Sequence, residues 1–517
     1  MTSSVGKVED KGVVQIEFQT SETKEVSGFI YEDPKKAPRP RPEERRLVFK
    51  ADLLIVGLTS LVFLVNQWDR GNIGNAHGQF YNAISLYYIG YVICILPANL
   101  SVRFLKPHRQ IGGCVVLFAI LSCCMADAKN AGTVLALRII FGFISAFLQA
   151  LTIYTSMWYK KNELATRTGI FYSAATIAGG FSGLIDYAIQ KNLDGALGHS
   201  AWQWLFIIEG IAGVFVGLCC WILLPPAPDQ MKRNHWIFSE KEIEIAISRM
   251  KSYNVEHAEV QWKQIWLAVK DPKTTLFSFM NAGTSLALAS ISAFLPTFIA
   301  QFGYSKVRTQ LFSVIPYACA FVTLIVVNIW SDKVNRKGVF LMGLLCTSSV
   351  GYVILIAVHN VKVKIFATCL ITMGTFPGVT ILGAWTSINT GGFTKRASTW
   401  GIAEVTGQCL AILGSHIYTN PPQYIKGHSI ALAFNLLALI AVIICWFWMR
   451  WLNQPKEKEA LEHAEASGIN AVKISIAPDP PPVDHDSKAF IEEAICAHRD
   501  VVYTARIVSN HPSKHGK

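Results

Sequence analysis

The chain has 517 residues, of which 51% are hydrophobic and only 16% are charged, and its mean hydropathy is positive. A composition this apolar excludes an ordinary soluble enzyme of that length and predicts a membrane protein. The formal net charge of +12 does not indicate nucleic-acid binding, because Lys and Arg lie mostly in short segments beside apolar runs. That distribution reflects membrane topology, and we expect the lipid bilayer and no nucleic acid as partners.

The first fifty residues are polar and contain no short apolar run followed by a small-residue cleavage site. We therefore expect no secretory signal peptide, and the first span itself directs membrane insertion. Residues 1–50 are predicted to form a cytoplasmic N-terminal tail.

Twelve later segments are long and apolar enough for a helix to cross the hydrocarbon core, which takes about 20 residues. The predicted spans are 51–69, 80–104, 110–127, 130–158, 166–189 and 200–224, followed by 274–300, 309–330, 337–358, 362–388, 396–418 and 428–452. The sequence therefore predicts an all-α membrane protein with twelve transmembrane helices in two six-helix bundles, 51–224 and 274–452.

A polar linker, 225–273, separates the predicted bundles. It contains two short amphipathic patterns, and Ser239 with Glu242 forms a capping box at the start of the first. These patterns predict helices that lie along the membrane surface. They either gate or regulate the protein, or they tie the two bundles together.

Positive charge favours one side of the predicted membrane. Both termini and the linker are therefore expected to face the cytoplasm. Residues 453–517 are predicted to form a cytoplasmic tail without regular structure, because they include a Pro-rich run and mixed charges. The basic residues on that side are Arg45, Arg46, Lys50, Arg103, Lys106, Arg109, Lys160, Lys161, Arg167, Lys333, Arg336 and Lys337.

Polar residues inside the first bundle are functional candidates, because an ionisable group at membrane depth is costly. Arg138, Ser145 and Gln149 recur at helical spacing along the fourth span. Arg138 either binds a substrate carboxylate with its two-pronged guanidinium or pairs with a neighbouring span. Glu209 in the sixth span either exchanges a proton or is a fixed ion-pair partner.

The second bundle has comparable polar faces. Asn281 lies on the seventh span, and Glu404 and Gln408 lie one helical turn apart on the eleventh. These residues are predicted to line a polar cavity. Glu404 is the second candidate proton carrier, with a structural role as the alternative.

Nothing in the sequence predicts catalysis or a cofactor. Nearly all of the twelve cysteines lie inside apolar runs without metal-ligand spacing. We interpret them as packing residues and expect no metal. No nucleophile and base form a recognisable constellation, so we predict that the protein is not an enzyme.

The segment Asn328–Lys337 resembles the signature loop of the major facilitator superfamily. In that loop an Asp and basic residues latch neighbouring helix ends, and the resemblance implies this role for Asp332, Lys333 and Arg336. Asn328 stands where the superfamily usually has Gly.

More specific matches, spread between about residues 45 and 452, resemble the fungal anion:cation symporter family, which includes allantoate and vitamin permeases. The matching segments are Asp69–Ala76, Phe206–Gly210, Leu295–Thr297, Val314–Tyr317, Gly391–Arg396 and Pro421–His428.

This resemblance implies proton-coupled uptake of a small organic anion, such as nicotinate, pantothenate, biotin or allantoate, by alternating access. It implies proton coupling for Asp69, gating for Arg70 and Asn72, and substrate contact for Trp385 and Asn389. We expect a monomer in the plasma membrane.

Three departures from the family bear on substrate and gating: the stretch between Ala76 and Tyr81 is short, Ile388 stands where Asn is common, and Ser145 stands where Glu is common. Two other functions remain open. One is a nutrient sensor that transports little, and the other is proton-coupled efflux of drugs or metabolites.

Overall fold

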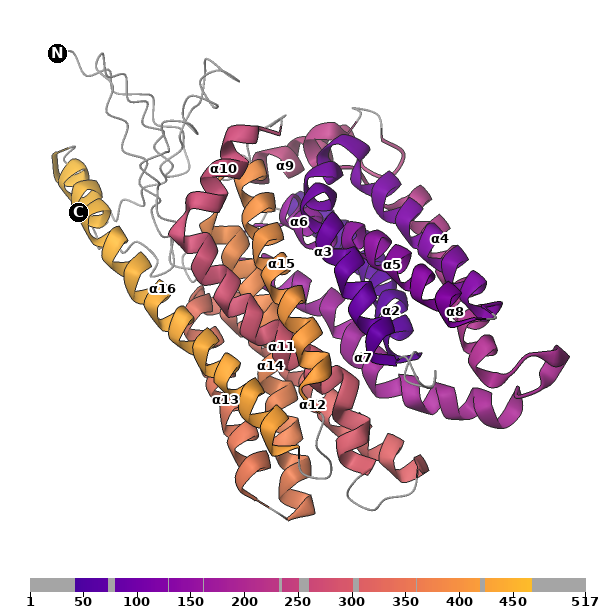
Figure 1. Ribbon diagram of the computed structural model, residues 1–517. Coiled ribbons are helices and arrows are strands. Elements are labelled where there is room, and N and C mark those ends of the chain that lie inside the picture. The colour runs from indigo at the N-terminus through magenta and orange to yellow at the C-terminus, as the bar shows by residue number, and fades with distance from the viewer. Residues whose placement is uncertain are drawn as a thin grey trace, which may run out of the picture. The chain divides into compact units, whose positions relative to one another are not determined.

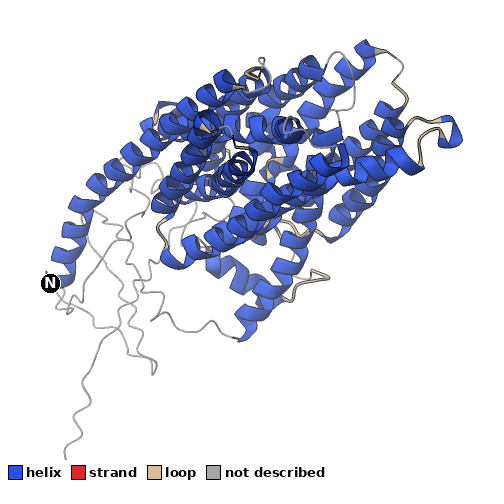
Figure 2. Cartoon of the chain, turned by 90° about the horizontal axis from the view of Figure 1, so that it is seen from below, coloured by secondary structure: helices blue, strands red, loops and turns tan. Residues whose placement is uncertain are grey.

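The computed structural model describes residues 42–466, except 73–79, 129, 161, 232–234, 251–259, 301–305, 359 and 419–423 (Figure 1). The regular elements in these residues are all helices (Figure 2). One compact unit, Pro40–Cys445, contains both halves of the helical core, while Trp446–Ala466 belongs to a second unit and continues the last helix.

The first half of the chain forms the first six spans. Its first span is a continuous helical stretch in which a π-helical turn, Asp52–Val56, joins α1 to α2. The fourth span is broken at Gln149-Ala150, where α5 ends and α6 begins. The elements are α1 (Pro42–Ala51), α2 (Gly57–Asn72), α3 (Phe80–Leu105), α4 (Pro107–Ala126), α5 (Ala131–Leu148), α6 (Leu151–Ser156), α7 (Leu164–Asn192) and α8 (Ala201–Leu223).

The linker contains the two predicted helices, and the second half supplies six more spans. The predicted capping box is confirmed: the Ser239 backbone N–H donates to Glu242 Oε2 at 2.9 Å, and the Glu242 N–H donates to Ser239 Oγ at 3.4 Å. The elements are α9 (Glu240–Met250), α10 (Trp262–Lys270), α11 (Pro272–Ala300), α12 (Lys306–Val334), α13 (Lys337–Ala357), α14 (Val361–Asn389), α15 (Phe393–His416) and α16 (Ile425–Ala466).

Helix α1 and the end of α16 differ from the predicted tails. Helix α1 begins at Pro42, with Pro at the first helical position and Glu43 and Glu44 in the first turn, which are favourable starting residues. Helix α16 continues to Ala466, so the prediction of irregular structure from residue 453 is wrong up to that point. The Glu, Lys, Ala and Leu residues of this stretch are strong helix formers.

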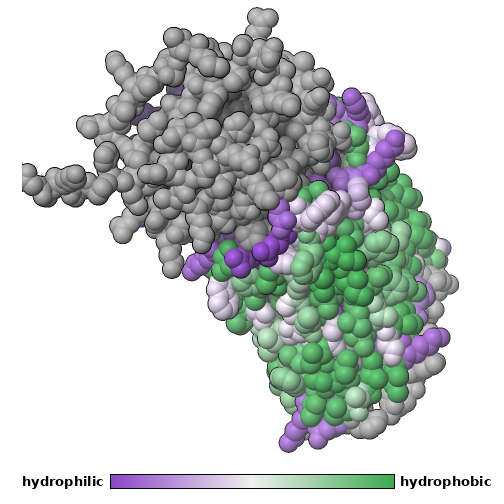
Figure 3. Space-filling model, turned by 90° about the vertical axis from the view of Figure 1, so that its left-hand side faces the viewer, coloured by the Kyte–Doolittle hydropathy of each residue, from purple (hydrophilic) through white to green (hydrophobic). Residues whose placement is uncertain are grey.

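The twelve long helices make the chain a multi-pass membrane protein. Eleven of them, among the described residues, are long and apolar enough to cross a bilayer. Helix α15 has 24 residues and is the twelfth, but its polar side chains lower its hydropathy. Figure 3 shows an apolar outer surface bounded at both ends by hydrophilic residues, as a lipid-facing belt requires.

Within Pro40–Cys445, the two halves meet mainly where α3 packs against α15 and α7 against α12, and α14 also contacts α7 and α6. Successive connections alternate between the two ends of the helices, and we call the end at which α1 begins the α1 face. Helices α3 and α5 approach so closely that a Cβ atom on Gly142 would lie 2.1 Å from the Tyr87 carbonyl oxygen. Small residues permit such backbone contact between membrane helices.

The Gly142 contact gives a direct stability test. We expect Gly142→Ala to lower the apparent melting temperature of the purified protein, because the new methyl group meets immobile backbone and overpacking of this kind costs about 1–3 kcal/mol. Gly132 in the same helix is the matched control, since a Cβ there meets nothing within 4 Å. Gly132→Ala is expected to leave the melting temperature unchanged or slightly higher. Equal melting temperatures for the two variants would contradict this account of α3–α5 packing.

Candidate functional site

A buried carboxyl group lies where α11 packs against α15. Glu404 is 2% exposed; its Oε1 accepts a hydrogen bond from Asn281 Nδ2 at 3.3 Å, and its Oε2 accepts one from Gln408 Nε2 at 3.0 Å. The Asn281 amide also donates to the Ala403 carbonyl at 2.9 Å, which fixes its orientation. The structure thus brings the predicted Glu404 and Gln408 face of α15 together with Asn281, which the sequence analysis had placed on a different span. We call Asn281, Glu404 and Gln408 the Glu404 cluster.

A glycine allows the Glu404 cluster to form. A Cβ atom on Gly407 would lie 2.5 Å from Asn281 Nδ2 and 2.7 Å from Ser285 Oγ. Any larger residue at position 407 would therefore push α11 away from α15 or displace the Asn281 amide.

The polar face of α5 is the corresponding feature of the first half. Arg138 is 2% exposed, and its guanidinium lies 5.2 Å from the centre of the Phe141 ring and 5.8 Å from that of Phe206. Flat guanidinium groups bind aromatic faces well, and desolvation strengthens the attraction. Glu209, on the same helix as Phe206, is 1% exposed.

The other residues of this polar face lie between α5 and its neighbours. Ser145 Oγ accepts a hydrogen bond from Asn66 Nδ2 of α2 at 3.2 Å, so a hydroxyl acceptor occupies the position where the related family often has Glu. Gln149 is half-buried at the break between α5 and α6.

The end of α14 carries Trp385 and Asn389, both buried. Asn389 Nδ2 donates to the Trp385 carbonyl at 2.8 Å, and the Trp385 ring meets Phe277 edge-on at 5.7 Å. Among the described atoms, neither Trp385 Nε1 nor Asn389 Oδ1 has a hydrogen-bond partner. Buried polar atoms are normally satisfied, so these two atoms are candidates for contact with a ligand.

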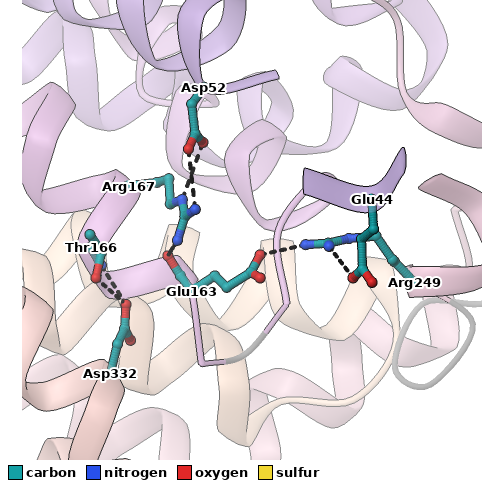
Figure 4. Close-up of polar contacts among 7 residues, drawn as sticks. All are labelled: Glu44, Asp52, Glu163, Thr166, Arg167, Arg249 and Asp332. Carbon is teal, nitrogen blue, oxygen red and sulfur yellow. Dashed lines mark hydrogen bonds and ion pairs between the residues drawn. The ribbon is translucent and has the colours of Figure 1, made fainter. Parts of the chain in front are cut away.

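A charge network at the α1 face connects α1, the α6–α7 connection and the linker (Figure 4). Arg249 of α9 bonds both Glu44 of α1 and Glu163, the latter at 2.6 Å. Glu44 also accepts from Lys160 at 3.0 Å. Arg167 of α7 binds both carboxylate oxygens of Asp52 at 3.2 Å.

A second contact joins α1 to the linker. Lys50 Nζ lies 2.7 Å from Glu242 Oε1. Partial burial acts to raise the pKa of the Glu242 carboxyl, but the hydrogen bonds from Lys50 and Ser239 outweigh burial and hold that pKa below its usual value.

Asp332 connects the second half of the chain to the first at the same face. Its Oδ2 accepts hydrogen bonds from Thr166 N at 2.6 Å and Thr166 Oγ1 at 2.7 Å (Figure 4). Its Oδ1 lies 3.0 Å from Lys337 Nζ. Lys333 and Arg336 are exposed at the helix ends beside it. The cation on Asp332 is therefore the buried Lys337, which the sequence analysis had noted only as a loop charge.

Two further contacts join the halves near the α1 face. Arg396 Nη1 donates to Ser156 Oγ at 3.4 Å. Asn328 is bonded within the second half to Thr380 at 2.9 Å, and it meets the first half at Gly169, where a Cβ atom would lie 2.8 Å from the Asn328 Cγ. The Asn that replaces the usual Gly in α12 thus packs against a Gly in α7.

Three predicted site residues cannot be placed in the site, and the sequence analysis did not name several residues of the charge network. Asp69, Arg70 and Asn72 end α2, but their side chains lie outside the described residues. The sequence analysis missed four residues of the charge network, namely Glu44, Asp52, Glu163 and Arg249. The three acidic ones lie close to basic loops, and that proximity was a usable signal.

The sequence profile of the Major Facilitator Superfamily matches residues 53–416. The MFS-type transporter cnsO of Penicillium expansum is 31% identical over 449 residues, covering 81% of this chain and 86% of its own. The high-affinity nicotinic acid transporter of Saccharomyces cerevisiae is 28% identical over 439 residues, covering 81% of each chain.

The fold is also found among solved structures. The proton:xylose symporter XylE, bound to 6-bromo-6-deoxy-D-glucose, matches with a TM-score of 0.59 over 78% of this chain and 96% of its own, at 15% identity. The predicted fold class and the resemblance to fungal permeases are confirmed. The chain belongs to the major facilitator superfamily and is a membrane transporter rather than an enzyme.

Proposed function

We propose that this transporter imports a small organic anion together with protons across the plasma membrane, with its α1 face in the cytoplasm. The observation that carries the proposal is a pair of buried groups, one in each half. The first is the Arg138 guanidinium in α5, and the second is the Glu404 carboxyl in α15, which accepts hydrogen bonds from two neutral amides. The name of the yeast nicotinic acid transporter supports a monocarboxylate of vitamin size as substrate.

Arg138 is the proposed anion ligand. Its guanidinium offers two parallel donors, which match the two oxygens of a carboxylate. The rings of Phe141 and Phe206 beside it form an apolar wall suited to a heteroaromatic or hydrocarbon substrate body. Trp385 Nε1 and Asn389 Oδ1 are proposed to supply polar contacts from the second half.

Glu404 is the proposed proton carrier, with Glu209 as the second candidate. When ionised, the Glu404 carboxylate accepts from both amides of its cluster. When protonated, it needs one acceptor, and Gln408 is able to rotate its amide and present the oxygen instead. Asn281 is fixed by the Ala403 carbonyl, so the half-buried Gln408 is the adaptable partner.

Alternating access would proceed by breaking the contacts at the α1 face. Asp332–Thr166 and Arg396–Ser156 hold the halves together there, and their release would open a path toward the cytoplasm. Moving one charge across 100 mV involves about 2.3 kcal/mol. An anion imported with one proton carries no net charge, so the pH gradient alone would drive it.

The proton role is tested by Glu404→Gln in proteoliposomes loaded with labelled nicotinate or related monocarboxylates. We expect accumulation driven by a pH gradient to disappear, because the amide cannot ionise, while substrate exchange without a gradient persists. Glu43→Gln removes an exposed carboxyl of α1 and is expected to behave as wild type. Gradient-driven accumulation by Glu404→Gln would remove Glu404 from the coupling mechanism.

The anion role is tested by Arg138→Lys and Arg138→Ala. Both are expected to reduce uptake at least about tenfold, the equivalent of ~1.4 kcal/mol of lost binding, because an ammonium group does not bind a carboxylate bidentately. Surface expression is measured in parallel, and Arg45→Ala on the exposed side of α1 serves as the matched loss of an arginine. Normal uptake by Arg138→Ala would exclude it from the substrate site.

A further inference from the structure

The short helix α10 exposes apolar side chains on a face that the described residues leave open. Trp262, Trp266 and Val269, which follow one another at helical spacing, are 79%, 62% and 48% exposed. Lys263 and Lys270 flank this stripe and are also exposed, and Lys270 Nζ lies 5.6 Å from the Trp266 ring centre. Large exposed apolar groups arranged in a stripe mark a contact surface.

The position of α10 restricts what that surface can contact. Only Asp271 separates its last residue from Pro272, the first residue of the membrane-crossing helix α11. Helix α10 therefore lies next to the end of a membrane-crossing helix, at the α1 face beside α15 (Figure 1). Trp side chains are enriched at this depth, where an apolar ring and a polar N–H are both accommodated.

The opposite side of α10 is fixed to the start of α15. Gln264 and Ala268 are buried, and the Gln261 N–H donates to Thr394 Oγ1 at 3.2 Å. Asp271 pairs with Lys395 Nζ at 3.1 Å. Gly392, which precedes α15, has a positive φ of +72° and lies close to Gln264. A Cβ atom added to Gly392 would lie 3.3 Å from Gln264 Oε1.

From this geometry we propose that α10 is a binding helix for anionic lipid headgroups of the membrane that the chain crosses. Trp262, Trp266 and Val269 enter the interfacial layer, and Lys263 and Lys270 bind the headgroup phosphates or carboxylates. Because the other side of α10 is bonded to Thr394 and Lys395, lipid binding also restrains the beginning of α15, the helix that carries Glu404 and Gln408.

The test uses the full-length protein in nanodiscs and follows amide hydrogen exchange, so it needs no transported substrate. Discs of phosphatidylcholine alone are compared with discs that also contain phosphatidylglycerol. We expect residues 262–270 to exchange more slowly in the anionic discs, by roughly tenfold or more for two lysines near the surface. The amides at the start of α15 are expected to slow in parallel.

Variants separate the charge from the apolar face. Lys263→Gln with Lys270→Gln is expected to abolish the difference between the two kinds of disc, whereas Lys241→Gln, an exposed lysine of α9, retains it. Trp262→Ser with Trp266→Ser is expected to speed exchange of α10 in both. Equal exchange of the wild type in neutral and anionic discs, or a persisting difference in the double lysine variant, would overturn the proposal, and the face would then belong to another partner. Neither outcome depends on whether the protein imports anions.

Discussion

The structure depends on one constraint: the bilayer core offers no water, so each polar group at that depth needs a partner inside the chain. The backbone meets this demand by forming helices. The side chains meet it by turning inward, and Arg138, Glu209 and Glu404 are at most 2% exposed although they lie on membrane-spanning helices. Burying an ionisable group in this way is costly, which is why these three residues are the functional candidates of the two halves.

Charged pairs are distributed differently at the α1 face, where they join separate parts of the chain. Helix α9 is bound to the first half through Arg249 with Glu44 and Glu163, while α10 is bound to the second half through Thr394 and Asp271–Lys395. The two ends of the linker are therefore each attached to a different bundle. This arrangement favours the interpretation of the linker as a tie between bundles, and Asp332–Thr166 adds a direct contact across them.

The spans were predictable because hydropathy follows from local sequence alone, and the Ser239–Glu242 cap because its two residues are three apart. Glu404 and Gln408 were recognisable as neighbours for the same reason, at one helical turn. Their contact with Asn281 was not, because it depends on how α11 packs against α15. Helix α1 was not predicted because its residues are polar. The pairing of Asp332 with Thr166 was not predictable either, because it joins positions 166 residues apart. Local signals reveal the candidates, and tertiary packing decides which of them meet.

The polarity of α15 has a consequence for how the protein is made. A helix enters the membrane from the translocon by its own partition energy when it is sufficiently apolar. Helix α15 carries Lys395, Arg396, Glu404 and Gln408 and falls short of the hydropathy that its eleven companions reach. Its insertion must therefore draw on partners already in the bilayer, and α11, which is synthesised earlier, supplies Asn281 as a hydrogen-bond donor to the Glu404 carboxyl group. The polar contacts of the Glu404 cluster thus make biogenesis of this span a cooperative step.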